Sequence, residues 1–305
     1  MTKKTRNWLI VLLSIPAAVI LAAVGLLIFD AAQPLPPIQP LPNPNGYDDF
    51  VQAGEIVKAG AKADFTELKN LSREELLVLV SKNAKALQIA RTGLQQESRV
   101  PLDYSPTSRA RFDKLPSIKY LAFAFMTEGK LAEVENRFND ASKSYLDLVR
   151  LANQSGRGGT LIDEMVSIAF EAMVTENLQK LPGRLDAKSC RETAATLETL
   201  DAQRQSWNEV MRQEDAWSRR TFPELRYRLS ALMAANSQKK IERHVEQRYK
   251  EQEIKTRQLL IDLAARAYEL DKGHRPANLA DLVPDYLKAI PQDPVTGTNL
   301  TYSPR

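Results

Sequence analysis

The sequence contains few of the residue types on which most catalytic and metal sites depend. Its 305 residues include one cysteine, Cys190, and two histidines, His244 and His274. A single cysteine cannot form an intramolecular disulfide, and we expect Cys190 to be buried as a small apolar side chain. His244 lies in a charged segment and His274 in a turn, and neither has a second ligand at metal-binding spacing. We therefore predict no metal site, no bound cofactor and no histidine-based catalytic triad.

A large excess of charge of one sign is also missing. The 42 Lys and Arg residues are nearly balanced by 38 Asp and Glu residues, which gives a formal net charge of +4. So small a surplus does not indicate a nucleic acid partner. The glycine-rich stretch SGRGGT has no Lys-Ser or Lys-Thr after it and no strand pattern before it, so it is not a phosphate-binding loop.

Carboxylates are plentiful, and two adjacent pairs are the first to consider for chemistry. Asp48 and Asp49 lie in YDDF, and Asp163 and Glu164 lie in LIDEM. Paired acids are what glycoside hydrolysis needs, which keeps an envelope glycan hydrolase as an alternative function. Both pairs also fall in the first turn of an expected helix, where acids complement the helix dipole. We favour this second interpretation and predict no catalytic residue.

One long apolar segment is present, at residues 8–29: WLIVLLSIPAAVILAAVGLLIF, without a charge. As a helix it would be about 33 Å long, which matches the hydrocarbon core of a bilayer. Three basic residues precede it and predict a cytoplasmic N-terminus at residues 1–7. We expect residues 8–29 to be a single-pass inner-membrane anchor, with the bulk of the chain extracytoplasmic, in the periplasm of a Gram-negative cell.

The alternative for this segment is a cleaved signal peptide. Such peptides have an apolar region of about 7 to 15 residues and a small residue three positions before the cleavage site. Here the apolar run is longer, and Phe29 or Asp30 would take that position. The absence of cysteine near the junction excludes a lipoprotein. We favour the uncleaved anchor.

Residues 30–45 contain six prolines, which excludes a helix and favours polyproline II. At about 3.1 Å per residue this linker predicts a semi-rigid spacer of roughly 35 to 45 Å. We expect it to hold the folded body away from the membrane.

Residues 46–254 have a helical pattern throughout and predict one extracytoplasmic helical domain. Ser72 and Glu75 have the spacing of a capping box, so a helix should begin there. The loop RVPLDYSPTSRARFDKLP should separate that helix from the next, which we expect to begin at about Ser117. Asp186 should begin one long helix that runs on until Pro223 interrupts it.

The stretch from Ala122 to Gln154 resembles one degenerate tetratricopeptide (TPR) unit, a pair of antiparallel helices. The matching positions are Phe125, Gly129 and Ala132 in the first helix and Phe138, Ala141 and Tyr145 in the second. Small residues at these positions let two helices approach closely while the aromatic rings fill the remaining space. We expect an irregular, TPR-like packing of helical hairpins.

Residues 255–305 combine a helix with a proline-rich tail that ends in IPQDPVTGTNLTY. We expect Thr296 and Gly297 to form the turn of a small β-hairpin that packs on the helix from Leu259 to Leu270. The region resembles the C-terminal part of the major pseudopilins of type II secretion systems. The matching positions are Tyr268, Gly273, Pro276, Leu279, Leu282, Pro291, Asp293, Pro294, Gly297 and Tyr302.

This resemblance implies two further expectations for the tail. A secretion-system or pilus accessory component becomes another alternative function. Some pseudopilins bind calcium in this loop, but here Asp285 and Asp293 are its only carboxylates. Calcium takes six to eight oxygen ligands, so we predict no metal in the tail.

The whole arrangement resembles a set of single-pass membrane proteins of planctomycete-type bacteria to which no activity is assigned. The resemblance rests on the basic start, the anchor, the proline linker, NGYDDF, the segment RFNDASKSYLDLVRLANQSGRGGTLID and the DPVTG tail. We predict a mainly α-helical, membrane-tethered scaffold or adaptor that binds a protein or peptide through a helical surface. Its expected partners are the bilayer, through residues 8–29, and another protein.

Overall fold

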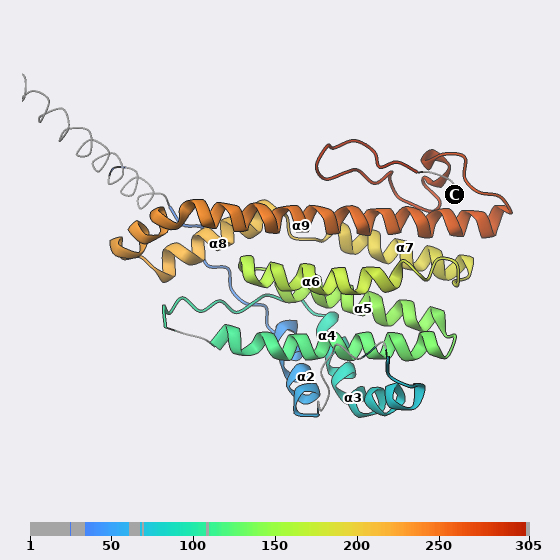
Figure 1. Ribbon diagram of the computed structural model, residues 1–305, viewed down its shortest axis with the longest axis horizontal. Helices are drawn as coiled ribbons and strands as arrows, with labels where there is room; N and C mark the ends of the chain where they lie inside the picture. Colours follow the sequence, from blue (N-terminus) through green and yellow to red (C-terminus); the bar gives the residue numbers. More distant parts are fainter. Residues whose placement is uncertain (1–24, 26–33, 61–67, 69, 108–109, 303–305) are drawn as a thin grey trace, which may run out of the picture.

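The described residues of the computed structural model, 25, 34–60, 68, 70–107 and 110–302, form a mainly helical body (Figure 1). This confirms the mainly α-helical part of the expected fold class. The elements in chain order are α2 (Gly46–Gly60), α3 (Arg73–Leu94), α4 (Ala110–Val134), α5 (Phe138–Gly156), α6 (Leu161–Leu178), α7 (Ala187–Ala202), α8 (Trp207–Thr221), α9 (Leu225–Lys272) and the 3₁₀ helix η2 (Leu279–Leu282).

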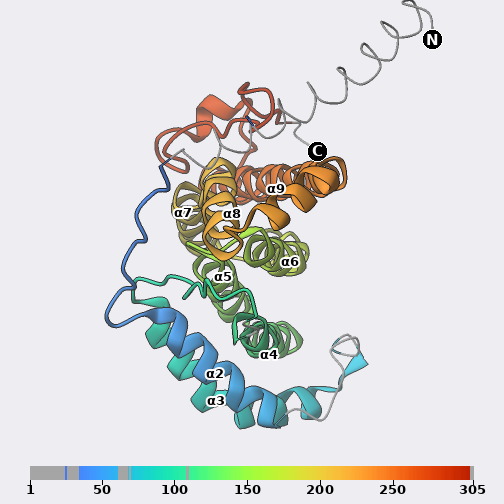
Figure 2. The same ribbon diagram turned by 90° about the vertical axis from the view of Figure 1, so that its left-hand side faces the viewer.

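The helices form a curved body in which α2 to α6 follow one another in sequence order and α7 lies against α5 and α9 (Figure 2). α2 packs against α3 and α4, α4 against α5, α5 against α6, and α7 against α9. One hydrophobic core runs through this stack, from Phe50 in α2 to Leu287 after η2. Each helix buries one apolar face against its neighbours, which supplies most of the stabilisation of helices of this length.

α4 and α5 form the helical hairpin that the small and aromatic residues predict. Phe125, Ala141 and Tyr145 are fully buried between the two helices. A methyl group on Gly129 would overlap the ring of Tyr145, so only glycine lets the helices come this close. The hydroxyl group of Tyr145 donates to Glu133 at 2.8 Å, which satisfies the one polar atom that the ring carries into the core.

Two helix starts are as predicted, and one predicted helix is divided. Ser72 and Glu75 form a capping box at α3, and the Asp186 side chain accepts a hydrogen bond from the backbone of Ser189 at α7. The expected long helix after Asp186 ends at Ala202 and restarts at Trp207. Ser206 and Glu209 form a second capping box that begins α8, and this local start is the reason for the break.

α4 begins at Ala110, seven residues before the predicted start, and carries Pro116 inside its first turns. As the seventh residue of the helix, Pro116 lacks the N–H that would bond to the carbonyl four residues before it, so α4 forms here despite one missing helical hydrogen bond. α2 crosses α4 at Ser117, the residue after this proline: a methyl group on Gly54 would overlap the carbonyl oxygen of Ser117. Packing of α2 and α4 therefore favours a helix where the loop was expected.

α9 is continuous through residue 254, where the sequence suggests a boundary between body and tail. Residues of its C-terminal half, such as Leu260 and Leu263, lie in the same core as α2 to α7. Gly273 ends the helix in the left-handed conformation, with φ 75°. The helical part of residues 46–272 is thus built around a shared core.

The tail packs on α9, as expected, but it is not a β-hairpin of two strands. Leu282 and Leu287 are buried in the main core, and the Arg257 guanidinium donates to the carbonyl of Gln292 at 2.6 Å. Among residues 273–302, one antiparallel bridge joins Gln292 and Asn299, around a turn with Gly297 at φ 71°. Prolines in the flanking chain lack the N–H that a longer ladder needs, which limits the pairing to one bridge.

The predicted cytoplasmic segment 1–7 and nearly all of the predicted anchor 8–29 lie outside the described residues. Within the described ranges no helix has both the length and the apolar character needed to cross a bilayer. The described part of the linker, in blue in Figure 2, runs along the body. It does not project as a spacer: the Arg220 guanidinium donates to the carbonyl of Pro36, and that of Arg99 to the side chain of Gln39.

Candidate functional site

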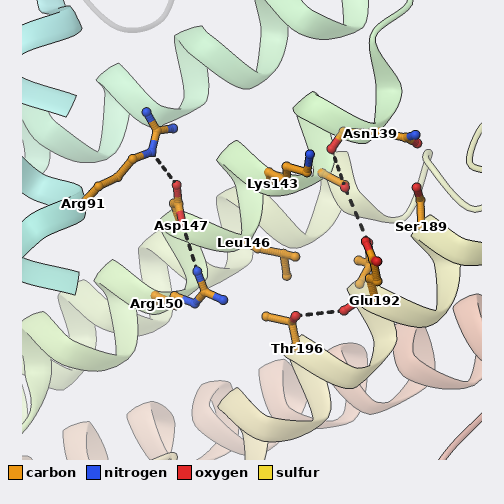
Figure 3. A pocket seen from close by; sticks show the side chains of 11 residues that line it. Arg91, Asn139, Lys143, Leu146, Asp147, Arg150, Ser189, Glu192 and Thr196 are labelled. Carbon is orange, nitrogen blue, oxygen red and sulfur yellow. Dashed lines mark hydrogen bonds and ion pairs between the residues drawn. The ribbon is translucent and has the colours of Figure 1, made fainter. Parts of the chain in front are cut away.

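A groove across α3, α5 and α7 is a candidate ligand site. It consists of two adjoining hollows of about 410 Å³ and 380 Å³, which share Arg150 and Thr196. Figure 3 shows Arg91 reaching in from α3, Asp147 and Arg150 from α5, and Thr196 from α7. We refer to this continuous surface as the groove.

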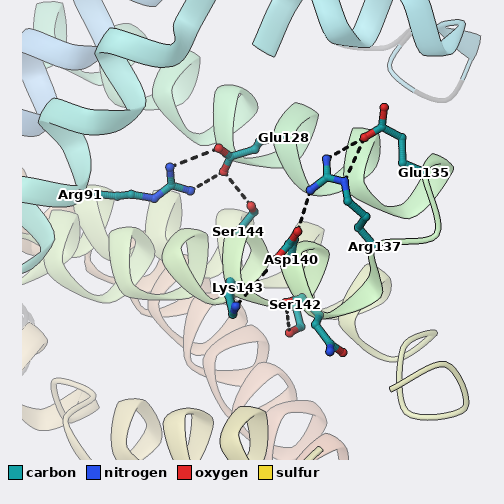
Figure 4. A network of polar contacts seen from close by, with 9 residues as sticks. Arg91, Glu128, Glu135, Arg137, Asp140, Ser142, Lys143 and Ser144 are labelled. Atoms are coloured by element: carbon teal, nitrogen blue, oxygen red, sulfur yellow. Dashed lines mark hydrogen bonds and ion pairs between the residues drawn. The ribbon is translucent and has the colours of Figure 1, made fainter. Parts of the chain in front are cut away.

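Arg91 fixes the α3 side of the groove. Its guanidinium forms a bidentate pair with Glu128 of α4 and donates through Nε to Asp147 of α5 at 2.8 Å. Glu128 also accepts from the hydroxyl group of Ser144 at 2.7 Å (Figure 4). One side chain thereby connects three helices, and the planar fork of arginine suits this geometry.

The floor of the groove is ionic but nearly neutral. Asp147 accepts from Arg91 on one oxygen and pairs with Arg150 on the other, at 3.2 Å (Figure 3). Lys143 is 71% exposed and lies 3.7 Å from Asp140, and Glu192 lies 3.8 Å from Lys188. Charges of both signs alternate along the surface, so the groove does not select strongly for an anion or a cation.

The α7 wall and the far end of the groove offer hydrogen-bond acceptors. The hydroxyl groups of Thr196 and Thr199 donate to carbonyls of their own helix, which leaves oxygen lone pairs toward solvent. The Gln154 amide donates to the carbonyl of Leu94 at 3.2 Å, and its Oε1 is buried without a hydrogen-bond partner among the described residues. A ligand that donates N–H groups would find acceptors in the two threonine hydroxyl groups.

The two acidic pairs singled out in the sequence lie elsewhere. Asp48 and Asp49 are in the first turn of α2, and Asp163 and Glu164 are in the first turn of α6. Asp163 forms a capping box with Thr160, whose backbone N–H donates to it at 2.7 Å. Neither pair lines the groove. For Asp163 this confirms a structural role at a helix start.

Glu164 has different surroundings, which its position in the sequence does not reveal. It is 5% exposed, and it shares the interior between α6 and α9 with Glu171, which is 1% exposed. Arg204, in the turn after α7, pairs with Glu171 at 2.6 Å. Burial and the negative charge of Glu171 raise the pKa of Glu164 to about 7. Burial also raises the pKa of Glu171, and the pair with Arg204 opposes that increase.

α7 and α9 add the remaining members of this group. Arg257 of α9 donates to Asp201 at 2.8 Å and pairs with Glu253 of the same helix. We call the whole set the buried ionic cluster; it comprises Glu164, Glu171, Asp201, Arg204, Glu253 and Arg257. Carboxylates outnumber guanidinium groups in it by four to two. This imbalance disfavours full ionisation of the four carboxyl groups.

The other candidates from the sequence are placed as follows. Cys190 is fully buried, as expected, and burial raises the pKa of its thiol to about 11. His274 lies against the ring of Tyr268 after α9. In the tail, Asp293 accepts from the backbone of Val295 and Thr296 within its own turn. No three Asp, Glu, His or Cys side chains among the described residues come together in a way that could hold a metal ion.

Comparison with known proteins adds no assignment to this geometry. The chain matches no model of a protein family, no curated protein and no solved structure. The candidate site therefore rests on the groove itself.

Sequence reasoning missed the groove and the buried ionic cluster. The groove brings Arg91, Asp147 and Thr196 together from three helices, and no local pattern links them. For the cluster a partial signal exists: Glu164 and Glu171 are seven residues apart, so they share a helix face with the buried residues Ile168 and Thr175. Acids on the apolar face of a helix indicate a buried polar contact.

Proposed function

We propose that this chain is a membrane-tethered, extracytoplasmic scaffold or adaptor that binds an extended segment of another protein in the groove. The observation that carries the proposal is the pair of adjoining hollows across α3, α5 and α7, with exposed polar side chains from all three helices. Packed helix axes are about 8 to 10 Å apart, so crossing three helices takes about 20 Å. An extended peptide of about six residues spans that distance.

The chemistry of the groove favours a polypeptide over other ligands. An extended peptide presents one N–H and one carbonyl per residue. The hydroxyl oxygens of Thr196 and Thr199 accept from its N–H groups, while Arg150 and Lys143 donate to its carbonyls. Nucleic acid would need a net positive surface, and the mixed charges here do not provide one.

The remaining parts of the proposal rest on the sequence of the N-terminus and on the α4–α5 hairpin. The uncharged segment 8–29 supports a single-pass anchor with residues 1–7 in the cytoplasm. The helical hairpin of α4 and α5, with the glycine contact between them, supports a TPR-like scaffold, an architecture that serves for peptide and protein recognition.

The test is to obstruct the groove at its centre. Thr196 contributes to both hollows, so Thr196→Trp places a large side chain where they meet. Peptides that bind the full wild-type chain in nanodiscs are first selected from a random library. Their affinity for the Thr196→Trp variant, measured by fluorescence polarisation, should be at least tenfold weaker than for the wild type. The matched control is Glu176→Trp, at an exposed position on α6 outside the groove, which should retain the binding. Equal affinity of both variants, or no selectable peptide, would contradict the proposal.

A further inference from the structure

The contact between Pro36 and Arg220 places the folded body closer to the predicted anchor than the linker length alone indicates. Pro36 is only seven residues beyond Phe29, the last residue of the apolar segment. An extended chain of seven residues reaches at most about 25 Å. Since Arg220 holds Pro36 against the body, the end of α8 lies within this distance of the expected anchor. The linker therefore does not separate the body from the anchor by the roughly 35 to 45 Å that the sequence predicts.

The segment that this places next to the membrane has an unusual charge. From Arg219 to Arg243 the chain has seven Lys and Arg residues and only two Glu. The whole chain has a formal net charge of only +4, so this short stretch holds more surplus positive charge than the complete protein. A local net positive charge of this kind attracts an anionic membrane, and Lys239, Lys240 and Arg243 are exposed to contact it.

Aromatic side chains cluster at the same turn. The ring of Phe222 lies 6.0 Å from that of Trp217, edge to face, and 5.2 Å from that of Tyr227. Tyr227 is 38% exposed, and Arg220 stacks over the ring of Tyr104 at 5.7 Å. Tryptophan and tyrosine beside basic residues are typical of the interface between lipid headgroups and acyl chains.

The N-terminal part of α9 adds exposed apolar side chains. Met233 is 89% exposed and Ile241 is 50% exposed, although methionine and isoleucine are usually buried. Lys239 and Lys240 are exposed between them, and neither pairs with a carboxylate among the described residues. Apolar and basic residues along one helix allow it to lie in the surface of a bilayer.

We infer that residues 217–243, the α8–α9 corner, bind anionic phospholipid headgroups at the membrane surface where the anchor emerges. The inference rests on the tether in the proposed function and is independent of the groove. A membrane is the partner because the chain itself brings one within reach and because the charge of the corner complements it. The corner then acts as a second membrane contact that orients the groove relative to the bilayer.

The test places a fluorophore on the corner of the full chain in vesicles. Met233→Cys provides the label site, and Cys190 should stay unlabelled because it is buried and its thiol has a raised pKa. Protein without the added cysteine is the blank. We expect quenching by brominated lipids in vesicles that contain phosphatidylglycerol and at least twofold less in pure phosphatidylcholine. Lys272→Cys, at the opposite end of α9, should show no quenching.

Charge variants distinguish lipid binding by the corner from an effect of the net charge of the whole protein. Lys239→Glu with Lys240→Glu should reduce the quenching of the label at residue 233 by at least half. Lys255→Glu with Lys288→Glu changes the net charge equally at exposed positions outside the corner, and should leave it unchanged.

Three outcomes are informative against the proposal. If Lys239→Glu with Lys240→Glu leaves the quenching at residue 233 unchanged, the corner does not bind lipid headgroups. The same conclusion follows if the chain stays in the membrane during carbonate extraction but the label at residue 233 is not quenched. Release of the full chain by carbonate overturns the tether, and this inference with it. Peptide binding in the groove is measured separately and does not depend on these results.

Discussion

The groove and the buried ionic cluster are both built on arginine–carboxylate pairs, but the pairs of the groove are exposed to water and those of the cluster are buried. In each, one arginine pairs with two carboxylates: Arg91 of α3 with Glu128 of α4 and Asp147 of α5, and Arg204 with Glu171 of α6 and with its near neighbour Asp201. The Arg91 side chain is 40% exposed, whereas that of Arg204 is 5% exposed. Water can replace the partners of the first arginine but not those of the second. Only the groove can therefore exchange its contacts with a ligand.

The largest expected effect comes from breaking the buried pair. Arg204→Ala leaves Glu171, which is 1% exposed, without its cation. Loss of one partner of a buried ion pair typically costs about 3 to 5 kcal/mol of unfolding free energy. Urea unfolding of the variant and the wild type at pH 7 measures the difference. A double change, Arg204→Met with Glu171→Leu, removes both charges and should recover a large part of the loss.

A loss under 1 kcal/mol for Arg204→Ala would contradict the view that this pair is sealed from water.

The second prediction concerns how the ionisation of Glu164 in the buried ionic cluster changes stability with pH. The pKa of Glu164 is about 7 in the folded protein against an ordinary value of 4.5. The proton on Glu164 therefore stabilises the folded state at low pH, and this contribution is lost as pH rises from about 4.5 through 7. Glu164→Gln keeps a neutral side chain at every pH. At pH 8 it should be more stable than the wild type by about 2 to 3 kcal/mol, and at pH 4 the two should be similar.

Unfolding midpoints in urea at both pH values give this comparison. Glu176→Gln, at an exposed position on the same helix, is the control and should behave like the wild type. If the advantage of Glu164→Gln is the same at pH 4 and pH 8, Glu164 does not titrate as proposed.

The smallest stability effect is expected at the groove. Arg91→Ala removes the pairs with Glu128 and Asp147, but both acids can turn to water. We expect a loss of about 1 kcal/mol, typical of a partly exposed pair, and less at 1 M salt because such pairs are screened. Thermal unfolding at low and high salt tests this. A loss as large as that of Arg204→Ala, insensitive to salt, would remove the contrast between the two regions.

Local signals in the sequence predict much of the fold, while the site depends on contacts that the sequence does not contain. Ser72 with Glu75 predicts a helix start, and Gly129 with Tyr145 predicts a close hairpin, because each feature involves residues near one another in the chain. The capping box at Ser206 has the same form, and recognising it would have predicted the break between α7 and α8. By contrast, the buried state of Glu164 depends on side chains from α6, α7 and α9 at once.

α9 has a mechanical consequence for the parts it connects. With 48 residues and a rise of about 1.5 Å per residue, it is a rod of roughly 70 Å. Its N-terminal part belongs to the α8–α9 corner, Arg257 of the buried ionic cluster lies in its C-terminal half, and its last turns contact the tail through the rings of Tyr268 and Tyr286. Because the C-terminal half of α9 is packed in the main core, the orientation of the corner follows that of the body. One continuous helix thus sets both the distance and the angle between the corner and the tail.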